Sequence, residues 1–313
     1  MSELLNKIDA RTKLAGTNKL EILLFTLGQD SRTGRKEHFG INVFKVREVM
    51  RAPEMARAPE MPVAVEGMVS LRGVLVPVVD IAKYARVETR KKPEILIVTE
   101  YNGKTQGFLV EAVDTILRLD WTAMKVPPEM LTSNLGGLVT AVTEQGDGRL
   151  IMMLDVEKIL SATSNQDDDR RFIGIKPLNK KSTVLFADDS SVARSQIENT
   201  LRAMSVDFIC AINGKQAWES LQTIAAQAEA THVKVNQVIQ VILTDVEMPE
   251  MDGFMLTRKI KGDSRFAGIP VVMHSSLSGM SNQQLGQSVG VDAYVSKFEP
   301  HKLAAVLHHL LSR

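Results

Sequence analysis

The chain has little cysteine, no excess charge of either sign and no long apolar run. Its one cysteine, Cys210, excludes a disulfide within the chain and fits a reducing compartment. The apolar run 208–212 around it predicts a buried, inert thiol. A formal net charge of +1 gives no overall field toward nucleic acid or a membrane surface. No run approaches the roughly 18 apolar residues of a membrane span, and the start lacks an apolar signal core. We therefore expect a cytoplasmic protein without a nucleic-acid partner or membrane insertion.

The length of 313 residues predicts about two domains, and the residue pattern changes along the chain. Residues 1–17 carry apolar side chains at helical spacing, which predicts a short helix that packs on its own domain or docks elsewhere. Residues 162–182 are polar and turn-rich, which predicts a linker. The acidic run 167–169 within it is interpreted as solvated rather than as a metal cluster.

The stretch between these segments is rich in short strands and turn signals. Asn102-Gly103 and the run 146–148 each separate two apolar stretches, as in β-hairpins. Residues 73–83 and 148–158 match in Gly, Leu, Asp and Lys at a constant offset of 75. Unless this match is chance, it predicts two similar β subdomains, each with a strand followed by a short helix capped near the Asp.

Several motifs in this part resemble the CheW-like coupling domains. Residues 70–73, Ser-Leu-Arg-Gly, correspond to the family's Asn-Leu-Arg-Gly core, and residues 25–28, 39–41 and 46–49 match its opening strands. The resemblance covers about 18–161. It implies two interlocked five-stranded β barrels that bridge chemoreceptors to the CheA-type histidine kinase of chemotaxis. An insert at 29–38 lengthens the first hairpin.

The same resemblance implies a set of residues near partner surfaces: Val46, Glu48, Gly67 and Arg72. The residue types support Arg72 most, because it lies between turn-prone residues and arginine suits interfaces. For the others the alternatives stay open: a core position for Val46, a solvated face for Glu48 and a tight turn for Gly67.

From residue 183 onward, apolar strands alternate with helical patterns, and each of four strands ends in a polar group. Asp188-Asp189, Asp245, Ser275 and Lys297 follow these strands in chain order. The carboxyl ends of parallel strands share one edge of a sheet, where ligands bind. Clustered carboxylates repel unless a cation lies among them, and Mg²⁺ prefers such hard oxygen ligands. Any one of these residues alone could be a helix cap, a turn residue or a surface charge.

The joint pattern resembles the receiver domain of two-component response regulators over residues 183–313. It implies a flavodoxin-like (βα)5 fold with strand order 2-1-3-4-5, in which Asp245 accepts a phosphoryl group. Lys297 and Ser275 would contact that group, and Tyr294 would repack as a switch. The implied Mg²⁺ ligands are Asp188, Asp189, Asp245 and the backbone carbonyl of Glu247.

Two features depart from the receiver pattern. Receivers usually have proline after the lysine, often in cis, where this chain has Phe298, so the loop and the lifetime of the phosphorylated state are open. Residues 225–237 also lengthen the second crossover.

The order of the domains resembles CheV-type chemotaxis proteins. It implies a multidomain adaptor at membrane-associated chemoreceptor arrays whose coupling of receptor to kinase is modulated by phosphotransfer to Asp245. The alternative is a phosphate sink for the kinase with a constitutive scaffold role. We expect no turnover enzyme, because Asp188-Asp189 lacks the Asp-x-Asp motif of the haloacid-dehalogenase phosphatases. The receptor, the stimulus and the sign of the response stay open.

Overall fold

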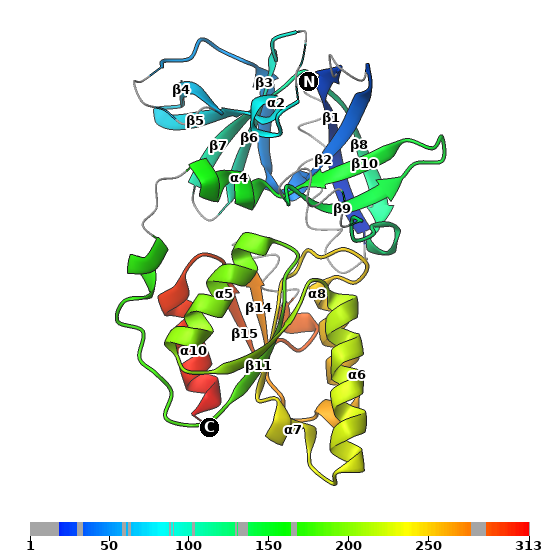
Figure 1. Ribbon diagram of the computed structural model, residues 1–313, viewed down its shortest axis with the longest axis vertical. Coiled ribbons are helices and arrows are strands. Elements are labelled where there is room, and N and C mark those ends of the chain that lie inside the picture. Colours follow the sequence, from blue (N-terminus) through cyan, green and yellow to red (C-terminus); the bar gives the residue numbers. More distant parts are fainter. Residues whose placement is uncertain are drawn as a thin grey trace. The chain divides into compact units, whose positions relative to one another are not determined.

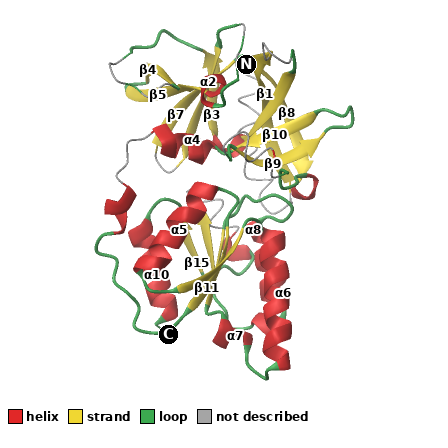
Figure 2. Cartoon of the chain, viewed as in Figure 1, coloured by secondary structure: helices red, strands yellow, loops and turns green. Residues whose placement is uncertain are grey.

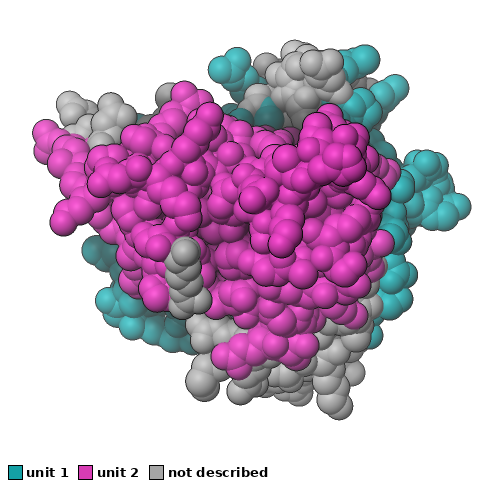
Figure 3. All heavy atoms as spheres, turned by 90° about the horizontal axis from the view of Figure 1, so that it is seen from below, with its two compact units in different colours: residues 1–14, 19–165 teal, residues 15–18, 166–313 magenta. Residues whose placement is uncertain are grey.

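The computed structural model divides into two compact units, drawn in Figures 1 and 3. It describes residues 19–29, 34–57, 61, 64–87, 89, 91–101, 104–128, 130, 137–163, 168–276 and 286–312. The expected helix at 1–17, positions 30–33 of the insert and residues 277–285 lie outside these residues. Within them, no helix is both long and apolar enough to cross a membrane.

The first unit is built from two five-stranded sheets, confirming the all-β prediction (Figure 2). One has the order β8-β1-β2-β10-β9, and its strands are β1 (Lys19–Gln29), β2 (Lys36–Asn42), β8 (Ala112–Asp120), β9 (Val139–Glu144) and β10 (Leu150–Leu154). The other has the order β3-β6-β7-β5-β4, and its strands are β3 (Val46–Arg51), β4 (Val65–Leu71), β5 (Val74–Asp80), β6 (Ile95–Tyr101) and β7 (Lys104–Val110). Short 3-10 turns are η2 (Val43–Lys45) and η3 (Trp121–Ala123).

Each sheet is closed into a barrel by one isolated bridge between its two ends. Ala56, downstream of β3, exchanges both backbone hydrogen bonds with Met68 of β4, at 2.9 and 2.8 Å. Lys125, downstream of β8, does the same with Val142 of β9, at 2.8 Å. The two closures occupy equivalent places, so the expected pair of barrels is confirmed.

The repeated stretch has the same local structure in both barrels. Asp80 ends β5 and caps α2 (Ile81–Tyr84), because its Oδ1 accepts the Lys83 N–H at 3.1 Å. Asp155 follows β10 and its Oδ1 accepts the Lys158 N–H at 2.9 Å in α4 (Val156–Thr163). Strands β5 and β10 each pair in parallel with one neighbour and antiparallel with the other. The match at an offset of 75 is therefore structural.

Strand β1 shows how the barrels are held together. Its residues Leu20, Ile22 and Leu24 pack in a core with residues of β9 and β10, whereas alternate residues join a core shared with strands of the other sheet. In that shared core Phe25 stacks on Phe39 with ring centroids 6.1 Å apart. Because successive side chains of a strand point to opposite faces, β1 contributes to both cores. Each fully buried large side chain adds about 1.5–3 kcal/mol to the free energy of unfolding.

The second unit is a parallel five-stranded sheet of order β12-β11-β13-β14-β15, confirming the expected order. Its strands are β11 (Thr183–Ala187), β12 (Asp207–Ala211), β13 (Val241–Thr244), β14 (Val271–Ser275) and β15 (Ala293–Ser296). Its helices are η4 (Asp168–Phe172), α5 (Ser191–Ala203), α6 (Gly214–Ala230), α7 (Val235–Val238), α8 (Gly253–Gly262), η5 (Ser264–Phe266) and α10 (Pro300–Leu311). One sheet face packs against α6, α7 and α8, and the other against α5 and α10 (Figure 1).

Two expectations are settled by this packing. The lengthened crossover forms the end of α6 together with α7, and its Ala225, Ala228 and Val235 are buried in the core. The prediction for Cys210 was wrong, because β12 is the edge strand of the sheet and the cysteine on it is exposed.

Barrel closure gives a first prediction, at Gly67 of β4. A Cβ there would lie 2.6 Å from the carbonyl oxygen of Ala56, the residue that closes the barrel. We expect Gly67→Ala to lower the free energy of unfolding by about 2 kcal/mol, the range of overpacked interiors, in urea unfolding. Gly146→Ala is the control, because its Cβ would meet nothing within 4 Å. Equal stability of the two variants would contradict this close approach.

Candidate functional site

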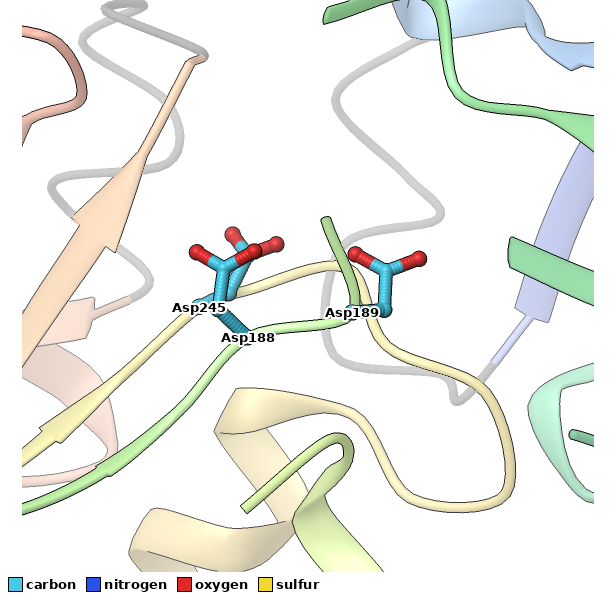
Figure 4. A group of neighbouring side chains, drawn as sticks. All are labelled: Asp188, Asp189 and Asp245. Carbon is cyan, nitrogen blue, oxygen red and sulfur yellow. The ribbon is translucent and has the colours of Figure 1, made fainter. Parts of the chain in front are cut away.

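Three carboxylates meet at the carboxyl edge of the parallel sheet. Asp188 and Asp189 follow β11, and Asp245 follows the neighbouring β13. One ligand oxygen of each lies within 4.8 Å of those of the other two. Figure 4 shows the three side chains projecting to the same side of the strand ends. Asp188 and Asp245 are buried and Asp189 is partly exposed, so two of these carboxylates have given up most of their contact with water.

Lys297 brings the compensating charge from β15. Its Nζ lies 2.9 Å from Asp188 Oδ2 and 2.9 Å from Asp245 Oδ2, and its side chain is only 2% exposed. A buried ammonium is stable when it is paired in this way. Three carboxylates still outnumber the one ammonium among these four side chains. The surplus of negative charge favours a bound cation.

Backbone hydrogen bonds fix the orientation of the carboxylates. Asp188 Oδ1 accepts the Ser190 N–H at 3.0 Å, and Asp245 Oδ1 accepts the Val246 N–H at 2.6 Å. Ser190 also caps α5 through a bond from the Ala193 N–H at 3.4 Å. The capping alternative for this stretch is therefore correct for Ser190, while the neighbouring acids lie in the carboxylate cluster.

Arg194 supports the acid pair and was missed in the sequence. Its guanidinium donates to the backbone carbonyls of Asp188 and Asp189, both at 2.9 Å. The only signal was its position on the first turns of the helix after the acids. A bond to backbone carbonyls requires no particular residue type at the partner, so no motif revealed it.

The loop from 246 to 252, which carries Glu247, is held from two sides. A Cβ on Gly253 would lie 2.0 Å from the Asp245 carbonyl oxygen, so glycine lets α8 begin directly beneath the site. Asp252 caps α8 by accepting the Met255 N–H at 2.6 Å, and burial raises its pKa. Asn213, which the sequence did not single out, donates to Glu250 at 3.0 Å.

Ser275 and Tyr294 meet beside the carboxylates. Ser275 ends β14 and is 1% exposed, and Tyr294 lies on the adjacent β15. Burial raises the pKa of Tyr294 to about 12, although a hydrogen bond with Ser275 opposes the shift. Tyr294 therefore stays neutral near pH 7. The Lys297 N–H donates to the Ser275 carbonyl at 3.0 Å, which joins these residues to the lysine.

The turn after Lys297 differs from the proline-containing turn of receivers. Phe298 has a φ of 61°, in the left-handed region that a bulky L-residue rarely adopts. Proline is fixed near −65° and cannot take this conformation. Among the described residues no peptide bond is cis, so this chain makes the turn with a left-handed residue in the trans form.

The coupling-domain residues fall into two groups. Arg72 has a left-handed backbone with φ of 50° and a side chain 72% exposed, and it pairs with Glu48 at 3.0 Å. Val74 and Leu75, next along the chain, are also exposed. Val46 is 2% exposed in the shared core, and Gly67 is buried against the Ala56 carbonyl. This placement corrects the expectation of a partner surface for Val46 and gives Gly67 a packing role.

The three carboxylates are a suitable donor set for Mg²⁺, which prefers hard oxygen ligands and keeps several waters. Asp189 is partly exposed, which leaves room for such waters. These residues fit Mg²⁺ because they carry a surplus of negative charge and offer oxygen ligands.

Comparison with known proteins finds relatives of both units. Residues 21–164 match the CheW-like domain family, and residues 184–308 match the response regulator receiver domain family. Chemotaxis protein CheV1 of Helicobacter pylori is 29% identical over 331 residues, covering 99% of each chain. CheV3 of the same organism is 28% identical over 280 residues, 88% of this chain and 89% of the relative. Chemotaxis protein CheY1 of Helicobacter pylori is 35% identical over 130 residues, which cover 41% of this chain and 95% of the relative.

The charge balance of the site predicts the effect of removing Lys297. Lys297→Met leaves buried carboxylates without their ammonium, which costs about 3–5 kcal/mol of unfolding free energy when one partner of a buried pair is lost. Millimolar Mg²⁺ should recover part of that loss, measured by urea unfolding with and without the ion. Lys302→Met is the control, because its pair with Glu299 is exposed and such pairs contribute about 1 kcal/mol or less. A similar small loss in both variants would contradict the pairing.

Proposed function

The chain belongs to the response regulator receiver family and joins that domain to a CheW-like domain, as in CheV-type chemotaxis proteins, and on this basis we propose that it is a phosphorylatable chemotaxis adaptor. Its CheW-like unit couples chemoreceptors to a CheA-type histidine kinase, and phosphotransfer to Asp245 modulates that coupling. The observation that supports the proposal most is the buried group of Asp188, Asp245 and Lys297 beside Asp189.

The proposed reaction is transfer of a phosphoryl group from a kinase phosphohistidine. An Asp245 carboxylate oxygen forms the bond to phosphorus while the phosphorus–nitrogen bond breaks, and the imidazole keeps the electron pair and takes a proton. Lys297 neutralises phosphoryl oxygens from its place beside Asp245. Asp188, Asp189, Asp245 and the Glu247 carbonyl would hold Mg²⁺, which supplies further positive charge to the phosphoryl oxygens when bound. We propose no catalytic turnover.

The proposed switch is electrostatic. An aspartyl phosphate adds nearly two negative charges to a site where Lys297 already pairs with two carboxylates. Ser275, the last residue of the neighbouring strand β14, would bond the phosphate. Tyr294, hydrogen-bonded to Ser275, would then repack. A local charge change of this kind biases a two-state element.

The proposed partner surface is the turn between β4 and β5. Arg72 is exposed there and pairs with the largely buried Glu48 of β3, and Val74 and Leu75 of the same hairpin are also exposed. An arginine next to exposed apolar side chains is typical of protein interfaces. We propose that this turn contacts the receptor or kinase at chemoreceptor arrays.

The test is a reconstituted assay of receptor-controlled kinase activity in receptor-containing membranes. The unphosphorylated chain should restore receptor control, and a small phosphodonor with Mg²⁺ should change that control several-fold in either direction. Asp245→Asn should restore control but ignore the phosphodonor, whereas Arg72→Ala should fail to restore control. Asp263→Asn changes a partly exposed acid of the receiver unit that pairs with Arg265, and it serves as the matched control for the loss of an acid.

If control is the same with and without phosphorylation, the switch proposal fails. The chain would then be a constitutive scaffold whose receiver acts as a phosphate sink.

A further inference from the structure

The segment between the two domains, residues 168–182, is packed against the receiver. We call it the connecting segment; Figure 1 shows it running beside α10 toward β11. Its first part, η4, contacts both α5 and α10. Ile175 and Leu178 pack against the core formed by α5, α10 and the sheet. Its polar composition predicted a linker, and Ile175 and Leu178 attach it to the receiver.

Hydrogen bonds hold the connecting segment to the ends of the same two helices. The Leu178 N–H donates to the carbonyl of Met204, which ends α5, at 2.7 Å. His308 Nε2 of α10 donates to the Lys176 carbonyl at 2.8 Å. Lys180 Nζ lies 3.5 Å from the Leu311 carbonyl. The last carbonyls of a helix need partners from outside it, and the bonds from Leu178 and Lys180 supply them at the ends of α5 and α10.

Helix α10 connects the segment to the phosphoacceptor site. It begins at Pro300, directly after the turn of Lys297, Phe298 and Glu299. Lys297 is bonded at both ends, through Nζ to Asp245 and through its N–H to the Ser275 carbonyl. A turn this short, with a left-handed Phe298, has little freedom to absorb a movement of Lys297. A shift of Lys297 therefore reaches the start of α10.

The other end of the segment lies close in sequence to the coupling domain. Helix α4 ends at Thr163, and only residues 164–167 separate it from η4. Helix α4 is fixed to its barrel, because Gln106 donates to Thr163 at 3.2 Å and Lys45 pairs with buried Glu157 at 3.3 Å. Five Cα-to-Cα steps join Thr163 to Asp168 and span at most about 19 Å, a connection short enough for a displacement of the segment to reach α4.

We propose that the face formed by α5 and α10 is an intramolecular docking surface whose partner is the connecting segment, and that this contact carries the receiver's state to the coupling domain. Phosphorylation of Asp245 changes how the segment docks, and the changed docking acts on α4. The inference rests on the proposed function and adds the route of its regulation.

The test compares two isoleucines of the same segment. Ile175→Asn removes an apolar contact with the α5–α10 face, whereas Ile173→Asn changes a side chain that is 70% exposed. Both variants should accept phosphoryl on Asp245 at the wild-type rate and restore receptor control of the kinase. Only Ile175→Asn should lose the change in control that phosphorylation causes. His308→Ala, which removes the bond to Lys176, is a second docking variant in case Ile175→Asn folds poorly.

Hydrogen exchange at the Leu178 amide gives a readout that needs no kinase. Phosphorylation of the wild-type chain should change this exchange rate several-fold, and Asp245→Asn should show no change. An unchanged rate on phosphorylation, or a full phosphorylation response in Ile175→Asn and His308→Ala, would overturn the inference. If the wild-type chain itself shows no phosphorylation effect on kinase control, the proposed function fails instead, and the exchange rate still decides whether the segment responds.

Discussion

The arrangement at the sheet edge depends on one constraint: three carboxylates share a largely buried space with a single ammonium. Lys297 can reach both Asp188 and Asp245 only because β14 alone separates β13 from β15. The glycine that starts α8 and the arginine that binds the carbonyls of the acid pair keep the loops close enough for this contact. Because this surplus of negative charge is held in place by rigid elements, an added cation or phosphoryl group changes the electrostatic energy of the site strongly.

The proposed coupling role makes a different demand on the first unit, because a partner surface has to be held in a fixed position. Two barrels closed by equivalent bridges, with a core shared between them, give a rigid support for the β4–β5 turn. Arg72 in this left-handed turn has a side chain that is 72% exposed and pairs with Glu48 at 3.0 Å. The chain thus combines a rigid unit with one whose charge balance changes in the proposed phosphorylation of Asp245.

Much of this could be predicted from the sequence, because the signals are local. Buried strands followed by Asp245 or Lys297 identify strand ends, and parallel topology then brings those ends together. The Asp80 and Asp155 repeat likewise predicted two capped helices. Arg194 was missed because it binds backbone carbonyls, which leave no mark in the residue types, and Asn213 because its partner Glu250 is distant in sequence. Cys210 was misjudged because an edge strand and a central strand have similar apolar patterns. The connecting segment looked free because its partners, the ends of α5 and α10, are supplied by the fold.

The most direct test of the central claim is the intact mass of the protein after incubation with Mg²⁺ and a small phosphodonor. We predict one phosphoryl increment in the wild-type chain and in Asp263→Asn, lost when Mg²⁺ is chelated and absent from Asp245→Asn. No increment in the wild-type chain, even with a cognate kinase, or an increment that persists in Asp245→Asn, would contradict the assignment of Asp245 as the phosphoacceptor.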